Sequence, residues 1–242
     1  DTKLPAYLVS TVLNDLIETG WAELIGSKAE RRFKLVPART IGISLHGDHI
    51  VGVLTNEQGK EITKKPSERE ISQGSSSPHD VLELTFDLVS DIYHESKQEA
   101  PKERILGVGI SVAGIVEWTK GVIAFAPDLV DKKYPWRNIN FEGLLQERIQ
   151  SKLDEQMLVI VENDVNSLAM ASTSTPREAE VSILMSGAGI GSAIVVGGRI
   201  ARGAHAAAGE IGHVIVDESP TAPPCRAGLN HTGCLESVAS NR

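Results

Sequence analysis

The feature that most constrains the fold is a β-rich pattern that occurs twice in the chain. Residues 40–62 read TIGISLHGDHIVGVLTNEQGKEI, and residues 181–203 read VSILMSGAGIGSAIVVGGRIARG. Each copy holds three pieces rich in β-branched residues, and glycine-containing turns separate the pieces. The pattern predicts a first meander (residues 40–62) and a second meander (residues 181–203). A meander that is repeated in this way predicts two related lobes.

The segment between the two meanders alternates between strands and helices. In chain order, the sequence predicts a helix near residues 80–96, a buried strand at ILGVGISVAG, a hairpin through VEWTKGVIAF, a helix near residues 141–153, a strand at MLVIVEN and a helix from Val165. Strands that alternate with helices indicate an α/β sheet, and the ligands of such sheets bind where strands end. The expected fold class is therefore α/β.

The composition is that of an ordinary globular protein. Of the 242 residues, 41% are hydrophobic and 23% are charged, and no apolar run is long enough to span a bilayer. The first residues, DTKLPAYLVS, lack the basic region and apolar stretch of a secretion signal, so we expect a cytoplasmic protein with no membrane partner. The net charge of −8 argues against a surface that is positively charged throughout and binds nucleic acid, although it is compatible with a local basic patch.

Residues 1–37 have a different pattern, which we interpret as part of a winged helix-turn-helix. From Tyr7 to Thr19 the apolar residues recur with the period of an amphipathic helix, and Gly20 follows as a stop signal. The next stretch, WAELIGSKAERRFKLVP, predicts a tight hairpin with basic residues on its turn and returning arm. In a winged helix-turn-helix, a helix enters the major groove and the hairpin contacts phosphates.

This interpretation predicts DNA contacts from five residues. Ser10, Thr11 and Asn14 lie on the polar face of the helix and are expected to face bases, while Arg31 and Arg32 are expected to face phosphates. The earlier helices of such a module do not precede this one, so we expect the chain to begin inside the module. The alternative is an amphipathic helix packed beside a charged loop.

Polar side chains with binding chemistry follow one predicted strand and the second meander. Asn163 and Asp164 come directly after the strand VIVEN, and Glu210 and His213 lie in the stretch AGEIGHV. Carboxylates, an amide and an imidazole can satisfy the paired donors and acceptors of neighbouring sugar hydroxyls, so we expect one cleft to hold all four. Three simpler roles stay open: a helix cap for Asn163 and Asp164, a solvated turn for Glu210 and a core imidazole for His213.

Several longer motifs carry a family resemblance. The run SGAGIGSAIVVGGRIARGAHAAAGEIGHV, preceded by VENDVNSLAMA and followed by CRAGLNHTGCLESVAS, resembles the ROK family, as do GISVAGIVEWTKGVI and YPWRNINFEGLL. This family comprises bacterial sugar kinases and sugar-responsive transcription repressors. The resemblance covers essentially the whole chain, and it includes an N-terminal helix and wing that the NagC/XylR-type repressors have and the kinases lack.

The resemblance implies an actin-like ATPase (ribonuclease H-like) fold of two lobes. Residues 1–37 would be the partial winged helix-turn-helix and residues 38–242 the sugar-sensing domain, with a first lobe at about 38–175 and the start of a second, truncated lobe at about 176–242. The resemblance also implies a set of sugar-binding residues, with a glycine at the turn beneath the sugar: Gly114, Asn163, Asp164, Glu210, His213 and Glu236.

One short stretch separates kinases from repressors. Kinases of the family carry Asp-x-Gly-Gly-Thr after the first strand, and the aligned residues here run from Ser44 to Asp48 as SLHGD. Phosphate binding needs close backbone N–H groups and a metal-ordering carboxylate, whereas His46 blocks that approach and Asp48 places negative charge against the anion. We therefore expect no ATP binding, no catalytic residue and, at Asp164, a vestigial general base that acts only as a hydrogen-bond acceptor.

The resemblance further implies a zinc site. ROK proteins commonly carry Cys-x-Cys-Gly-x-x-Gly-Cys-x-Glu, whose three thiolates bind zinc together with the His of the Gly-Glu-x-Gly-His turn. His213, Cys225 and Cys234 match this pattern, but Ala227 stands where the middle Cys would be, and the loop is two residues longer. Tetrahedral zinc is then one ligand short. His231 or a water supplies the fourth ligand, or the site stays empty with both thiols reduced.

The sequence thus predicts a sugar-responsive DNA-binding repressor of carbohydrate metabolism. Its expected partners are operator DNA, a sugar or sugar phosphate effector, and a second copy of the chain in a homodimer or higher homo-oligomer. The alternatives are an ATP-dependent ROK kinase of hexoses or amino sugars and a structural dimerising protein without a ligand. Turnover of ATP in the presence of hexoses distinguishes the kinase from the repressor.

Overall fold

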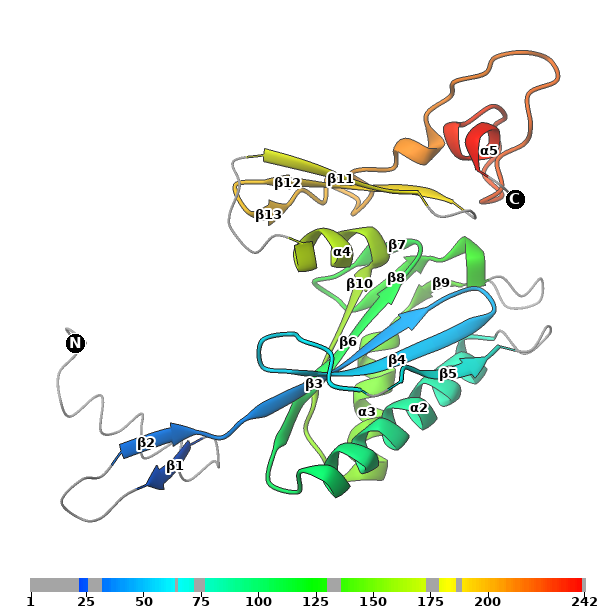
Figure 1. The fold of residues 1–242 in the computed structure, drawn as a ribbon. Helices are drawn as coiled ribbons and strands as arrows, with labels where there is room; N and C mark the ends of the chain where they lie inside the picture. Colours follow the sequence, from blue (N-terminus) through cyan, green and yellow to red (C-terminus); the bar gives the residue numbers. More distant parts are fainter. Residues whose placement is uncertain are drawn as a thin grey trace.

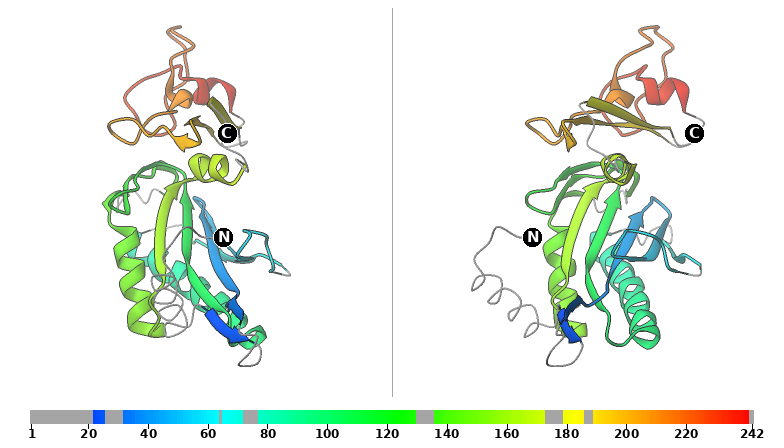
Figure 2. Two further views of the ribbon diagram at one scale, coloured as in Figure 1. Left: turned by 90° about the vertical axis from the view of Figure 1, so that its left-hand side faces the viewer. Right: turned by 60° about the vertical axis from the view of Figure 1, so that its left-hand side comes forward.

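The computed structural model describes residues 22–25, 32–63, 65–71, 77–129, 136–172, 179–185 and 189–240. It has a larger part built around a five-stranded sheet and a smaller C-terminal part around a three-stranded sheet (Figure 1). The short helix α4 (Asp164–Ser172) lies between the two sheets, as the turned views also show (Figure 2).

The larger sheet is mixed, with the strand order β10-β6-β3-β4-β5. Its strands are β3 (Ala38–Leu45), β4 (His49–Asn56), β5 (Ser67–Glu70), β6 (Arg104–Val112) and β10 (Leu158–Asn163). The central strands β3, β6 and β10 are parallel, whereas β4 and β5 pair in antiparallel fashion. Leu45 and Asn163 both pair with Val112, so the three parallel strands end at the same edge of the sheet.

Two helices cover one face of this sheet, α2 (Pro78–Glu99) and α3 (Phe141–Leu153) (Figure 1). Each begins at a side-chain cap: Ser77 accepts a hydrogen bond from the backbone N–H of Asp80, and Asn140 accepts one from that of Gly143. Their apolar stripes and the inward residues of the sheet form the main core. That core includes Ile41, Ile43, Leu88, Ile92, Val108, Ile110, Leu145, Ile149, Val159 and Val161.

A second, smaller sheet follows the carboxyl end of β6. It consists of β7 (Ile115–Glu117), β8 (Val122–Phe125) and β9 (Arg137–Ile139), and the 3-10 turn η1 (Pro127–Leu129) follows β8. The buried side chain of Trp136 packs near Phe141 at the start of α3. This packing fixes the small sheet against the larger part.

The C-terminal part holds the second meander. Its elements are β11 (Ala179–Met185), β12 (Ile190–Val196), β13 (Arg199–Ile200), the 3-10 turn η2 (Ile211–His213) and α5 (Leu235–Ala239). A separate apolar cluster joins this part to α4, and its members are Val165, Ala169, Ala193 and Val195, with Ile200 packed against them. A Cβ on Gly191 would lie only 2.6 Å from Val165 Cγ2, so glycine allows β12 to approach the helix.

The N-terminal hairpin consists of β1 (Ala22–Ile25) and β2 (Arg32–Leu35), which pair in antiparallel fashion. It extends away from the five-stranded sheet in Figure 1. The predicted DNA-facing residues Ser10, Thr11, Asn14 and Arg31 lie outside the described residues, and Arg32 is described only as the first backbone position of β2. The hairpin is therefore confirmed, and the winged helix-turn-helix stays a prediction.

The third strand of the first meander differs from the expectation. The sequence predicts it directly after NEQG, but only Glu61 forms an isolated bridge there, with Thr55, and β5 begins later, at Ser67. The side chain of Thr63 explains the break, because its Oγ1 accepts from Leu54 N at 2.7 Å and lies 3.3 Å from Leu54 O. The Thr63 side chain thus takes the N–H of Leu54 that a continuous strand would pair, while Ile62 N still donates to Leu54 O at 2.8 Å.

Helices long and apolar enough to cross a bilayer are absent from the described part of the chain.

Candidate functional site

A cavity of about 320 Å³ lies at the carboxyl edge of the parallel strands, between the two parts of the protein. This is the edge where ligands of open α/β sheets bind. Its lining includes every residue that the family resemblance predicts to bind sugar: Gly114, Asn163, Asp164, Glu210, His213 and Glu236. Residues far apart in the sequence therefore meet around one cavity.

Asn163 connects the floor of the cavity to the start of α4. Its Nδ2 donates to the carbonyl of Gly114 at 3.0 Å, and its Oδ1 accepts from Asn166 N at 3.0 Å. Gly114 has a φ of 146°, and a Cβ there would lie 2.2 Å from the carbonyl oxygen of Phe125, so only glycine fits. The helix-cap role that the sequence leaves open for Asn163 is thus present, and it places the side chain at the cavity wall.

Asp164 lies in the first turn of α4 and also lines the cavity. One carboxylate oxygen, Oδ1, accepts from Val165 N at 2.9 Å. The same carboxylate acts electrostatically on two groups at the edge, His46 and Glu210. Asp164 therefore combines a local backbone contact with a position between the end of β3 and the turn that carries Glu210.

The glycines of AGEIGHV allow this stretch to lie against the backbone of β12. A Cβ on Gly209 would come within 2.3 Å of Ser192 O, and one on Gly212 within 2.2 Å of Ile190 O. Ser192 Oγ also donates to Gly209 O at 2.6 Å. The close backbone contact presents Glu210 and the following His213 to the cavity.

His213 lies between the cavity and a second cluster of side chains. Its Nε2 is 3.9 Å from Glu210 Oε2, and its Nδ1 is 3.5 Å from Cys225 Sγ. The pKa of Glu210 is raised above its usual value of 4.5, first by burial and then by Asp164 and Glu236, while His213 opposes the shift. The negative charges of Asp164 and Glu236 are thus close enough to disfavour ionisation of Glu210.

Glu236 binds the start of β12, a strand whose first residues line the cavity. Its Oε2 accepts from Ile190 N at 3.0 Å, at the start of β12. A Cβ on Gly189 would lie 3.0 Å from the same oxygen, so glycine also serves this contact. Gly189 and the start of β12 therefore lie against Glu236 of α5.

The turn between β3 and β4 contains a pair of stacked histidines. The rings of His46 and His49 lie 4.5 Å apart, and His46 Nε2 is 3.1 Å from Ser44 Oγ. A hydrogen bond from His49 lowers the pKa of Asp48, and burial, followed by the charge of His49, lowers the pKa of His46. A neutral imidazole and an ionised carboxylate therefore occupy this turn near neutral pH.

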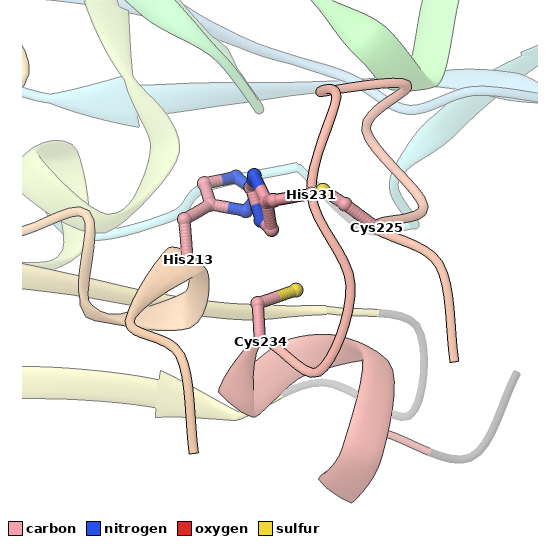
Figure 3. Close-up of side chains that lie close together, drawn as sticks. All are labelled: His213, Cys225, His231 and Cys234. Carbon is pink, nitrogen blue, oxygen red and sulfur yellow. The ribbon is translucent and has the colours of Figure 1, made fainter. Parts of the chain in front are cut away.

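Four potential metal ligands converge beside the cavity: His213, Cys225, His231 and Cys234. Figure 3 shows their side chains pointing toward one another, from η2, from the start of α5 and from the loop between them. The ligand atoms all lie within 4.8 Å of one another. Ligands of tetrahedral zinc are roughly 3.5 Å apart, so a modest contraction around an ion suffices.

The chemistry of these four residues fits zinc. The Nε2 atom of His231 is buried and has no hydrogen-bond partner, which is costly unless an ion binds it. Both cysteines are buried, and burial together with the neighbouring Cys234 raises the pKa of the Cys225 thiol. A cation would remove this cost by stabilising the thiolates. His231, in the longer loop, thus lies within the cluster as a candidate for the fourth ligand.

Two charged residues beside the cavity were not anticipated from the sequence. Glu162, 5% exposed, forms an ion pair with Arg202, whose guanidinium lies 4.6 Å from the ring centre of Trp118. The signal for Glu162 is present in the strand VIVEN, because a charge inside a buried strand requires a partner. Nothing in the local sequence identifies Arg202 as that partner.

The sequence profile of the ROK family matches residues 40–242. The chain belongs to the ROK family. Among curated ROK relatives, the xylose repressor of Caldicellulosiruptor bescii is 30% identical over 97% of this chain, and the glucokinase of Thermotoga maritima is 28% identical over 84%. This ROK chain spans 56% of the repressor and 57% of the glucokinase, a little over half of each relative.

Solved ROK structures share the fold. A ROK family transcriptional regulator that is a homologue of the E. coli MLC protein aligns with 98% of this chain and 58% of its own, with a TM-score of 0.72 at 20% identity. A ROK glucokinase from Streptomyces griseus, in complex with glucose and AMPPNP, aligns with 84% of this chain and 57% of its own, with a TM-score of 0.64 at 23% identity. The α/β fold of this ROK protein is thus related to that of the sugar kinases.

Proposed function

We propose that this ROK protein is the sensing portion of a sugar-responsive transcriptional repressor that binds DNA and does not use ATP. The observation that carries the proposal is the β3–β4 turn, which holds His46 and the ionised carboxylate of Asp48 where the family resemblance expects the phosphate-binding loop of a kinase. Curated xylose repressors among the relatives support the same conclusion, since the match to one of them extends over 97% of the chain.

The effector proposed for the cavity is a monosaccharide or its phosphate. Carboxylates at Asp164, Glu210 and Glu236 accept hydrogen bonds from hydroxyl groups, and the amide of Asn163 and the imidazole of His213 provide mixed donors and acceptors. Ile115, Phe125 and Leu229 line the same cavity and offer apolar contact to the faces of a sugar ring. This combination is typical of small-ligand sites with a few placed polar groups.

Loss of phosphoryl transfer follows from the charge of the β3–β4 turn. A phosphate group at this edge would meet the ionised carboxylate of Asp48 and the side chain of His46 instead of glycine N–H groups. Asp164, which the family resemblance implies as the general base of a kinase, would then serve the sugar as a hydrogen-bond acceptor only. The protein would bind a sugar without changing it, as a sensor requires.

Zinc has a structural role in this proposal. The ion would be held by four side chains: His213, Cys225, His231 and Cys234. It would cross-link η2 to the loop before α5 and would take no part in a reaction. With Nδ1 of His213 directed to the ion, its Nε2 stays available on the side of Glu210. The metal would therefore stabilise the turn that presents Glu210 to the sugar.

The DNA-binding part of the proposal rests on the N-terminal sequence pattern and on the β1–β2 hairpin. We expect a homodimer to place two helices in successive major grooves, with the hairpin arms beside phosphates. Binding of sugar between the two parts of the sensing domain would favour one relative arrangement of these parts. This shift in arrangement would change the position of the DNA-binding region.

A ROK sugar kinase is the second candidate. Its support is the glucokinase of Thermotoga maritima among the relatives and the presence of Asp164 at the cavity wall. The experiment that separates the two candidates is a thermal-shift screen of sugars and sugar phosphates, followed by a coupled assay for ADP with each ligand that raises Tm. A ligand that raises Tm without ADP release supports the sensor, and sugar-dependent ADP release supports the kinase.

A further inference from the structure

An ion pair outside the cavity connects the two walls that carry the proposed sugar ligands. Glu162 precedes Asn163 at the end of β10, and Arg202 follows β13 in the C-terminal part. The Arg202 guanidinium contacts Glu162 Oε2, with side-chain exposures of 19% and 7%. The pair is therefore largely shielded from water, where the interaction of two charges is strong and the loss of one partner is costly.

Glu162 fixes the wall that carries Asn163 and Asp164. Its second oxygen, Oε1, accepts from Asn163 N at 2.8 Å and from Asn166 Nδ2 at 3.1 Å. Asn163 in turn reaches the carbonyl of Gly114. One carboxylate thus binds Arg202 with one oxygen and the first turn of α4 with the other.

Arg202 fixes the opposite wall. Its carbonyl accepts from Ala208 N at 3.1 Å, which closes the loop between β13 and Gly209, and Glu210 follows that loop directly. The guanidinium lies over the ring of Trp118, between β7 and β8, as well as against Glu162. Arg202 therefore anchors the segment that delivers Glu210 onto the larger part of the protein.

We propose that Glu162 and Arg202 are positioning residues that set the separation of the two walls of the sugar pocket and thereby its affinity. This inference rests on the proposed function, because it concerns the same ligand. Hydrogen bonds to sugar hydroxyls weaken steeply outside a narrow range of length and angle, so walls that drift apart cannot both contact one ring. Neither residue lines the pocket itself, and each acts through its neighbours.

The variants Arg202→Met and Glu162→Gln test the pair. Methionine keeps the apolar stem of Arg202 and removes the charge, while glutamine keeps a carbonyl oxygen for Asn163 N and removes the ionic contact. We expect each variant to bind sugar about 10- to 100-fold more weakly, the effect of losing a hydrogen bond between the sugar and a charged group of one wall. Because both disrupt one contact, the double variant should lose no more than either single variant. Arg202→Lys should recover part of the affinity.

The matched control is Arg199→Met, which removes an exposed arginine from β13 in the same segment. Calorimetric titration with neutral pentoses and hexoses measures affinity, and thermal unfolding shows whether each variant is folded. Hydrogen exchange at Asn163 N–H, without any sugar, measures the pair independently of ligand binding. We expect faster exchange at this amide in Arg202→Met, where Glu162 has lost its partner, and unchanged exchange in Arg199→Met.

The outcomes separate the two proposals. If the wild-type protein binds a sugar and both variants bind it equally well, the positioning role is wrong and the proposed function stands. If the variants have a lower Tm but bind the sugar with unchanged affinity, the ion pair only stabilises the fold, and the inference is again wrong. If the wild-type protein binds no sugar, the proposed function is wrong, and unchanged exchange at Asn163 N–H would overturn the coupling of the two walls as well.

Discussion

Asn163 and Asp164 are adjacent, and the structure predicts opposite consequences for their substitution. Asn163 uses both side-chain atoms within the protein, one to cap α4 and one to hold the carbonyl of Gly114. The carboxylate of Asp164 accepts a hydrogen bond from Val165 N and faces the cavity. Asn163→Ala should therefore reduce stability, whereas Asp164→Asn should reduce sugar affinity and leave stability nearly unchanged.

The magnitudes follow from these contacts. A lost helix cap costs about 0.5–2 kcal/mol, and a lost internal hydrogen bond costs about 0.5–1.5 kcal/mol, so Asn163→Ala should lower the free energy of unfolding by about 1–3.5 kcal/mol. In Asp164→Asn the amide oxygen still accepts from Val165 N, and the loss is limited to about 1 kcal/mol for a charge at a helix N-terminus. A hydrogen bond to a charged acceptor contributes about 1.5–3 kcal/mol to binding, which is about 10- to 150-fold in Kd.

Urea unfolding followed by circular dichroism measures the stability of both variants, and calorimetric titration with a sugar that binds the wild-type protein measures affinity. Ser172→Ala, at the other end of α4, is the matched control for a polar contact on the same helix. Normal sugar affinity in Asp164→Asn would refute the reasoning and leave that residue with a role inside the protein alone. A stability loss in Asp164→Asn as large as that of Asn163→Ala would refute the division of roles.

Three further predictions concern the metal, pH and DNA. Elemental analysis of protein purified without chelator should find zinc in the wild-type protein, more in Ala227→Cys and little in His231→Ala; equal zinc in all three would contradict the four-ligand site. Burial lowers the pKa of His46 below 6.5, so the contribution of the neutral imidazole to stability is present above pH 6.5 and is lost as pH falls through the lowered pKa. The Tm of His46→Asn should therefore fall less on mild acidification than that of the wild-type protein. The same dependence of Tm on pH in both proteins would contradict this. Replacing Arg31 and Arg32 together should weaken binding to all DNA sequences and flatten its salt dependence, and an unchanged slope of affinity against salt would rule out the wing.

Regular elements were predictable where local signals agree. The helix expected near residues 141–153 is found as α3, because Asn140 supplies a cap and apolar residues recur on one face. The third strand of the first meander was misplaced, because the sequence pattern does not reveal that Thr63 would bond to Leu54 through its side chain. Such competition between side chain and backbone depends on a spatial approach that local propensity does not contain.

The sequence predicts which residues line the cavity, but it does not predict the contacts that connect its walls. Side-chain chemistry and family resemblance together indicate which residues gather, since the ends of parallel strands meet at one edge. For Asn163, the sequence left the cap and the ligand as alternatives, and the structure shows the cap and a position at the cavity wall, so the ligand role stays a prediction. The pairing of Glu162 with Arg202 was not predictable, because Glu162 lies in the five-stranded sheet, Arg202 lies in the loop after β13, and tertiary packing brings the two together.

The central claim is that the protein binds a sugar and does not phosphorylate it. Its most direct test is mass spectrometry of a sugar that binds, incubated with MgATP and the wild-type protein. We predict that the sugar is recovered unchanged, because the proposed function assigns the β3–β4 turn, with His46 and Asp48, to the place of the kinase phosphate loop. Sugar phosphate that accumulates with the wild-type protein, and does not accumulate with Asp164→Asn, would contradict the account and identify the protein as a kinase.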